Sequence, residues 1–245
     1  MEYSSAPYAQ EKTAILVDGG FYRKRAYNIF GDKEAVPRAD ELVAYCKRHL
    51  RFDKERPHEL YRIFYYDCPP LEGNVFHPLL QKSISLTKSM QHKWSVDFLS
   101  ELSSKRKVAL RLGELQEQES SYKLKPDTVK KLCRNEITVN DLTEKDFALN
   151  IVQKGVDMRI GLDIASLAYK KQVSQIVLIA GDSDFVPAAK HARREGIDFI
   201  LDPMRHGIKP SLNRHIDGLR CCVNENPNPA KEPLHINHIP PKKSR

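Results

Sequence analysis

The sequence has little cysteine, and the cysteines it has follow no recognised spacing. They are odd in number and contain no CxxC pair: Cys46, Cys68, Cys133, Cys221 and Cys222. A disulfide framework and a zinc knuckle are therefore both disfavoured, and a reducing, cytoplasmic location is expected. The chain also lacks a basic segment followed by an apolar leader, and no apolar run approaches the roughly 18 residues of a membrane span. We expect a protein that is neither secreted nor embedded in a membrane.

Several catalytic motifs are absent as well. The first apolar run ends in "VDGGFY" (17–22) rather than GxGxxG, and it places a carboxylate where a pyrophosphate would have to sit. This disfavours a dinucleotide-binding protein. The spacing of the nine histidines suggests neither a Ser–His–Asp nor a Cys–His arrangement.

Positive charge is in excess. Lysine and arginine number 40 against 32 acidic residues, which gives a formal charge of +8 and a pI near 9.1. Such a balance favours a polyanionic partner such as nucleic acid, and a basic protein without that partner is the alternative. With 245 residues, 40% of them hydrophobic, the chain can form one α/β domain, alone or with an appendage.

Short β-branched and aromatic runs alternate with segments of helical periodicity. We expect strands at 13–17, 60–67, 107–115, 174–180 and 197–202, helices around 21–29, 38–50, 156–171 and 184–196, and a further helical pattern over 78–104. The alternation shows no obvious hairpins. It predicts an α/β fold with a mostly parallel central sheet and helices on both faces.

Composition also predicts the domain limits. Residues 1–12 form an N-terminal lead-in, and one domain spans 13–223 with a polar insertion at about 116–150. The segment 224–245 is rich in proline and basic residues, and we expect it to be disordered.

Three aspartates follow predicted strands at the edge where ligands bind to such sheets. Asp18 immediately follows the first predicted strand, Asp182 follows "IVLIA" after one glycine, and Asp184 opens the next helix. On a helical wheel Asp157 lies in the apolar stripe of its helix, so it should point toward the sheet at the same edge. Asp163 lies on the flank of that stripe, about 9 Å further along at about 1.5 Å per residue, and is a secondary candidate.

Four carboxylates at one edge would repel one another unless a cation neutralises them. Oxygen ligands suit Mg²⁺ or Mn²⁺, so Asp18, Asp157, Asp182 and Asp184 are predicted as metal ligands and catalytic groups. Beside a basic surface, such a centre suggests phosphodiester hydrolysis. The alternatives are structural: turn formers at Asp18 and Asp182, a helix cap at Asp184 and a favourable helix-dipole position at Asp157. We interpret Asp67 and Asp202, which also follow strands, as structural or peripheral.

Cations and aromatic side chains near this edge could hold RNA. The candidates are Phe21, Tyr22, Arg23, Lys24, Arg25, Arg205, His206 and Lys209. The cations would bind phosphates in a salt-dependent manner, and the two aromatic rings could stack on bases. Solvated surface charge is the alternative for each cation.

Three segments together resemble the NYN domain, in its LabA-like branch, within the PIN-like nuclease superfamily. They are "ILVDGGFY", "QKGVDMRIGLDIASLA" and "VLIAGDSDFVPAAKHARREGIDFI", within a resemblance that runs from about residue 13 to 220. It implies three α/β/α layers and a Mg²⁺-dependent ribonuclease centre whose acidic positions fall on Asp18, Asp157, Asp182 and Asp184. Some members carry an asparagine shortly after the first aspartate. Here Gly20, Phe21 and Tyr22 stand in that region, a departure that affects substrate handling more than catalysis.

The sequence therefore predicts a metal-dependent ribonuclease that hydrolyses RNA and, as the resemblance implies, leaves 5′-phosphate and 3′-hydroxyl ends. Two alternatives stay open: a non-catalytic RNA-binding or scaffold module, and a metal-dependent phosphohydrolase acting on small phosphoesters. RNA is the expected partner, no membrane is involved, and the oligomeric state is open, a homodimer included.

Overall fold

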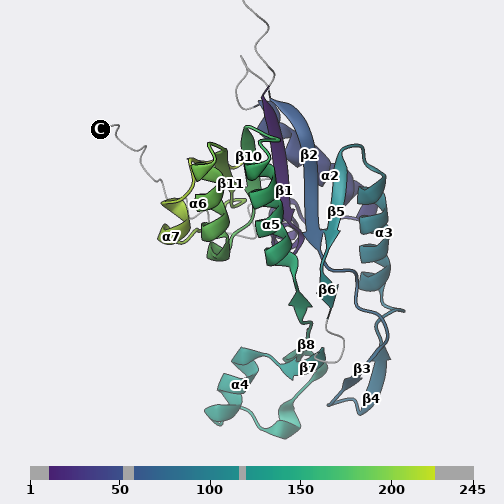
Figure 1. The fold of residues 1–245 in the computed structure, drawn as a ribbon. Coiled ribbons are helices and arrows are strands. Elements are labelled where there is room, and N and C mark those ends of the chain that lie inside the picture. The colour runs from purple at the N-terminus through teal and green to yellow at the C-terminus, as the bar shows by residue number, and fades with distance from the viewer. Residues whose placement is uncertain (1–10, 52–57, 116–119, 224–245) are drawn as a thin grey trace, which may run out of the picture.

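A six-stranded parallel sheet forms the centre of the molecule (Figure 1). The computed structural model describes residues 11–51, 58–115 and 120–223. The strands, in sheet order, are β12 (Gly218–Leu219), β11 (Asp198–Asp202), β10 (Gln175–Ile179), β1 (Lys12–Asp18), β2 (Glu59–Asp67) and β5 (Val108–Leu112). The predicted parallel sheet is confirmed.

Helices cover both faces of this sheet, which gives the predicted three-layer α/β/α architecture. One face carries α1 (Gly19–Phe30), α2 (Ala35–Arg48) and α3 (Met90–Ser104), and the other carries α5 (Val156–Tyr169) and α6 (Val186–Arg194). Along β1, Ile15 and Val17 belong to the first core, and Ala14 and Leu16 belong to the second. Because both faces are covered, the central strands read as continuous apolar runs rather than alternating ones.

The strand predictions hold within a few residues, but the predicted strand at 107–115 divides at Gly113. The chain leaves the sheet after β5, and β6 (Glu114–Leu115) pairs instead with β9 (Gln153–Lys154) in antiparallel fashion. A Cβ atom at Gly113 would lie 2.6 Å from the carbonyl oxygen of Lys154, so only glycine permits this close approach.

The helical pattern predicted over 78–104 is wrong in its first half. α3 begins only at Met90, where the Ser89 side chain accepts a hydrogen bond from the His92 backbone N–H and caps the helix. The preceding residues form a hairpin of β3 (Asn74–His77) and β4 (Lys82–Ser85). The other predicted helices are present. The helix predicted from residue 38 begins earlier, at Ala35, because Pro37 is tolerated in its first turn.

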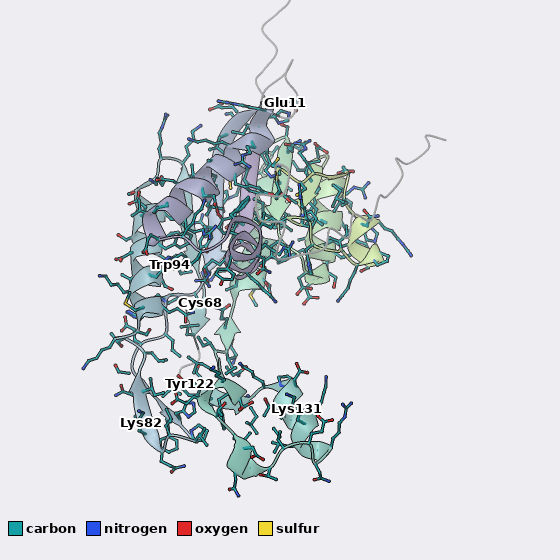
Figure 2. All side chains as sticks on the ribbon, turned by 180° about the vertical axis from the view of Figure 1, so that it is seen from behind. Glu11, Cys68, Lys82, Trp94, Tyr122 and Lys131 are labelled. Carbon is teal, nitrogen blue, oxygen red and sulfur yellow. The ribbon has the colours of Figure 1, made fainter. Side chains whose placement is uncertain are left out.

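A lobe outside the sheet contains most of the predicted insertion. It consists of the β3–β4 hairpin, β7 (Ser121–Leu124), α4 (Pro126–Cys133), two short 3₁₀ turns at Val139–Asp141 and Glu144–Asp146, and β8 (Phe147–Asn150). The β6–β9 pair joins it to the sheet, and the lobe projects beyond the end at which β1 and β2 finish (Figure 1). The ring of His77 lies 4.4 Å from that of Tyr122 and 5.1 Å from that of Phe147, which ties the hairpin to β7 and β8. Figure 2 labels Lys82 of the hairpin and Tyr122 of β7 in this lobe.

The predictions for the two ends of the chain fall mostly outside this description. Residues 1–10 of the lead-in and the whole segment 224–245 lie outside the described residues. No helix in the described ranges has the length and apolar character to cross a bilayer.

Candidate active site

The candidate site lies where the order of strands in the sheet reverses. From β1 the chain builds β2 and β5 on one side and then crosses to build β10, β11 and β12 on the other. β1 and β10 are neighbours in register, with Val17 opposite Ile179. The residues that follow them, Asp18 and the turn at Gly181–Asp182, therefore leave the sheet side by side, and crevices at such reversals are common ligand sites.

Asp18 is the most buried of the four predicted acids. It is half-buried at the end of β1, and its Oδ1 accepts a hydrogen bond of 3.1 Å from the Phe21 backbone N–H, capping α1. Burial raises its pKa to about 6, and the charges of Asp157 and Asp67 add to the rise. Asp18 is thus within electrostatic reach of Asp157.

Asp157 is at the predicted edge but not in the predicted environment. It occupies the first turn of α5, where its side chain is exposed rather than buried against the sheet, because the buried stripe of the helix begins one turn later at Ile160. The surrounding protein still desolvates it enough to raise its pKa, and the charges of Asp182 and Asp184 raise that pKa further.

Asp182 and Asp184 both lie in the turn after β10 and both are exposed. Asp182 precedes the 3₁₀ turn Ser183–Phe185, and its Oδ1 accepts a hydrogen bond of 3.3 Å from the Asp184 backbone N–H. The helix-cap role weighed for Asp184 is therefore wrong: the capping side chain is Asp182, and the Asp184 carboxylate is not needed to start the helix.

The four predicted acids share one property, which is the lack of a cationic partner in the described ranges. Within the described ranges, none of Asp18, Asp157, Asp182 and Asp184 forms an ion pair with a cationic side chain. No group of three or more histidine, cysteine or acidic side chains in the same ranges stands close enough together to hold a metal ion. The donor chemistry nevertheless fits Mg²⁺ or Mn²⁺, since every donor is a carboxylate oxygen left without a cation.

The other acids at this edge have partners of their own. Asp67 pairs with Arg23 at 3.1 Å, and Asp202 accepts hydrogen bonds from the Tyr45 hydroxyl at 2.5 Å and the His49 ring at 2.9 Å. Asp163, the secondary candidate, accepts hydrogen bonds from Tyr66 at 2.7 Å and Arg111 at 3.0 Å. These internal contacts stabilise the three carboxylates, so no bound ligand is needed to explain them.

Comparison with protein families identifies the fold. The model of the NYN domain matches residues 87–214, more than half of the 245 residues. The chain belongs to the NYN family. NYN domains are part of the PIN-like nuclease superfamily, and the match includes Asp157, Asp182 and Asp184. Asp18 lies outside the matched range, and the parallel pairing of β1 with β10 is what brings it to the other three acids.

Other comparisons add little. A crystal structure of a protein of unknown function from Vibrio parahaemolyticus shares 14% identity with this chain at a TM-score of 0.47, over 91% of this chain and 98% of that one. No curated protein matches the sequence.

Two of the residues predicted to bind RNA are buried in this NYN domain. Tyr22 is completely buried, with its hydroxyl donating to Glu41 at 3.1 Å, so its ring cannot stack on a base. Arg25 is 4% exposed and donates to the Met204 carbonyl oxygen at 2.9 Å. Both side chains lie on the inner face of α1, where they help to build the core.

Of the other candidates, three are exposed and three, including Arg23, are half-buried. Lys24, His206 and Lys209 are exposed, and the Lys209 ammonium donates to the Ser183 hydroxyl at 3.1 Å, between Asp182 and Asp184. Arg205 is half-buried and donates to the Val223 carbonyl oxygen at 3.3 Å. Phe21 is half-buried and its ring meets that of His206 edge to face, with 6.1 Å between centroids.

The sequence pattern did not reveal the role of Arg23. Burial acts to lower the pKa of Arg23, but Tyr65 and Asp67 outweigh it and raise that pKa, and Asp18 contributes to the rise. Arg23 therefore lies within the field of both the candidate site and Asp67. The position of Asp67 at the end of the strand next to β1 was a signal in the sequence. The ion pair between Asp67 and Arg23, however, depends on how α1 packs against β2.

The raised pKa of Asp18 predicts a pH-dependent gain in stability for Asp18→Asn. Because the folded-state pKa is above the ordinary value, Asp18 stabilises the fold at low pH and loses this contribution as the pH rises through about 6. Asparagine can cap α1 but cannot ionise. In EDTA, chemical unfolding should show the variant more stable than wild type by about 1–3 kcal/mol at pH 7.5 and similar to it at pH 4.

The exposed Asp97 on α3 supplies the matched control. Asp97→Asn should track wild type at both pH values. A gain for Asp18→Asn that is equal at pH 4 and pH 7.5 would contradict the electrostatic explanation.

Gly181 supports the turn that carries Asp182. A Cβ atom there would lie 2.5 Å from Cε2 of Phe21, so the ring occupies the space that a side chain needs. Gly181→Ala should cost about 1–3 kcal/mol in urea unfolding. Adding Phe21→Ala should remove most of that extra cost, whereas strictly additive effects would show that the ring does not constrain the turn.

Proposed function

We propose that this NYN domain is a divalent-metal-dependent ribonuclease of the LabA-like branch. The observation that supports this most is the presence of four carboxylates without cationic partners at the reversal point of the sheet, where two of them have raised pKa values. Carboxylates that repel one another are costly to maintain, and a site retained at such a cost is a functional candidate.

The proposed roles follow from position. Asp18, Asp157 and Asp182 would be the principal ligands of Mg²⁺ or Mn²⁺, and Asp184 a further ligand or the group that orients the attacking water. When bound, the ion would supply Lewis acidity and balance the negative charge of the phosphodiester and the acids. Asp18 and Asp182 are also helix caps, so backbone N–H groups fix one carboxylate oxygen of each in place.

The exposed cations would hold the RNA backbone. Lys24, His206 and Lys209 lie at the same edge, and Lys209 reaches the turn between Asp182 and Asp184. Hydrolysis would leave 5′-phosphate and 3′-hydroxyl ends. We further propose that the domain spans 13–223, with the lobe as its insertion. All five cysteines are free thiols, which agrees with the proposed cytoplasmic location.

The Asp157→Asn variant tests the nuclease. The substitution removes one charge from an exposed site and leaves the buried stripe of α5 intact. Wild type should cut labelled single-stranded and structured RNA in Mg²⁺ or Mn²⁺, and EDTA should stop it. The variant should be slower on the order of a hundredfold or more, equal to at least about 2.7 kcal/mol.

Asp97→Asn is again the control, and it should cut as wild type does. Equal cleavage by wild type and Asp157→Asn would place the activity elsewhere or in a contaminant. RNA binding without cleavage in either metal would identify a non-catalytic module, and turnover of a chromogenic phosphoester without RNA cleavage would identify a small-molecule phosphohydrolase.

Lys209→Ala should weaken RNA binding a few-fold and lower the slope of log K against log salt by about 0.7–1, because one phosphate contact is lost. Filter binding in EDTA across a salt series measures both quantities. Lys170→Ala, an exposed cation at the C-terminal end of α5 and so at the opposite edge, should change neither. Equal effects of the two variants would mean that binding reflects total charge rather than this edge.

A further inference from the structure

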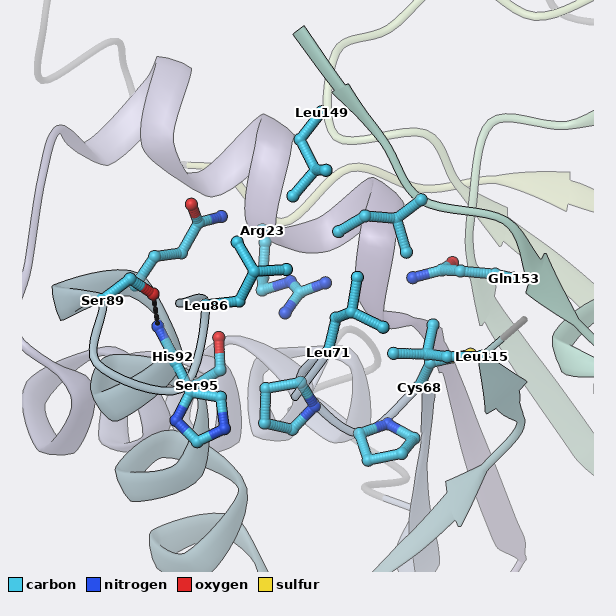
Figure 3. Close-up of a pocket in the computed structure, with 14 residues that line it drawn as sticks. Arg23, Cys68, Leu71, Leu86, Ser89, His92, Ser95, Leu115, Leu149 and Gln153 are labelled. Carbon is cyan, nitrogen blue, oxygen red and sulfur yellow. Dashed lines mark hydrogen bonds between the residues drawn. The ribbon is translucent and has the colours of Figure 1, made fainter. Parts of the chain in front are cut away.

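A cavity of about 120 Å³ lies between the sheet and the lobe, beside the candidate site (Figure 3). The segment after β2, the beginning of α3 and the strands that join the lobe enclose it. Its wall combines apolar and polar side chains. Among the apolar ones, Leu71 and Leu86 are buried, and Leu149 closes the cavity from the lobe. None of the four candidate acids lines this cavity, so it is separate from the metal-binding edge.

Six polar or charged residues line this space: Arg23, Ser89, Gln91, His92, Ser95 and Gln153. The Ser95 hydroxyl extends from α3, where the residue is 8% exposed, and the Gln153 amide extends from the opposite wall in β9 (Figure 3). The Arg23 guanidinium lies between them. Within the described ranges, neither Ser95 nor Gln153 uses its side chain in a hydrogen bond. A concave site in which apolar side chains and unpaired polar groups converge is typical of ligand pockets.

Arg23 connects the cavity to the candidate site. Its Nη2 donates to Asp67 at 3.1 Å, and Asp18 is among the acids that raise its pKa. The same guanidinium therefore lines the cavity and lies in the electrostatic field of the acidic edge. A ligand in the cavity would therefore contact a guanidinium that also lies in the field of Asp18.

The volume is of the order of one ring. An engineered apolar cavity of about 150 Å³ takes up benzene, so a cavity of about 120 Å³ is close in size to one six-membered ring and smaller than a fused pair. The Gln153 amide has both donors and an acceptor, as the hydrogen-bonding edge of a pyrimidine requires. Proteins hold unpaired bases by stacking against arginine planes and hydrogen bonding at the base edge.

On the basis of the proposed ribonuclease function, we propose that this cavity is a subsite that binds one pyrimidine base of the RNA. Ser95 and Gln153 contact the base edge, Leu149 covers one face of the ring, and Arg23 contacts the attached phosphate or the other face. The subsite gives the enzyme a preference for uridine or cytidine near the cleaved bond.

Binding in EDTA tests the subsite without requiring cleavage. Fluorescein-labelled oligouridylate and oligoadenylate of equal length are titrated with the full chain, and fluorescence anisotropy gives the two dissociation constants. Wild type should bind oligouridylate about tenfold more tightly, as expected for one well-held base. Leu149→Trp, which fills the cavity, should remove this preference.

Two further variants keep the test decisive. Val139→Trp adds the same side chain at a 72% exposed position of the lobe and should leave the preference unchanged. Gln153→Leu, at an exposed residue of similar size, should reduce the preference severalfold through loss of the amide alone. If thermal melting shows that Leu149→Trp is poorly folded, the Gln153→Leu result decides.

The outcomes separate this subsite from the nuclease activity. Equal affinity for the two RNAs, or a preference that survives both cavity variants, overturns the subsite even if Mg²⁺-dependent cleavage is found. A cavity-dependent preference without any cleavage retains the subsite and refutes the nuclease. Failure to bind either RNA refutes both.

Discussion

The parallel pairing of β1 with β10 is the constraint on which the rest of this molecule depends. It joins segments more than 160 residues apart in the chain, with Thr13 opposite Gln175 and Val17 opposite Ile179. Both strands are buried on both faces, so this register also fixes the two hydrophobic cores. Because the register ends both strands at the same level, Asp18 and Asp182 leave the sheet together. A shift of register would separate the two acids and misplace both cores at once.

The candidate site works against the stability that this pairing provides. Burial and neighbouring charge raise the pKa of Asp18 to about 6, so at neutral pH the fold holds an ionised group in an unfavourable environment. Elsewhere at the same edge, Asp67 and Asp202 are satisfied by Arg23, Tyr45 and His49. Other acids at this edge therefore do have hydrogen-bonding or cationic partners. That contrast between satisfied and unsatisfied acids is what distinguishes a candidate site from structural carboxylates.

The sequence was sufficient for the sheet and for the edge, because apolar runs identify buried strands and parallel topology places their ends together. It was not sufficient to predict which side chains outside the strands are buried. Arg25 lies beside exposed Lys24 and looks the same in sequence, yet it is buried through contact with Met204, 179 residues away. Residues 78–89 have apolar spacing that also suits a helix, and only the pairing of Val75 with Ile84 shows the hairpin. Such errors arise wherever tertiary contacts override local pattern.

The lobe shows how a local departure from the sheet can create specificity. Gly113 lets the chain turn out of the sheet against the Lys154 carbonyl, and β6 and β9 then carry the lobe past the acidic edge. The cavity exists only because this departure brings Leu149 and Gln153 over the segment after β2. The acids come from elements of the shared fold, whereas Leu149, Ile151 and Gln153 of the cavity wall come from the lobe and the segment that joins it to the sheet. If the proposed subsite holds a base, a change in the lobe would alter which base is held and leave the carboxylates in place, because the two sets of residues share only the neighbourhood of Arg23.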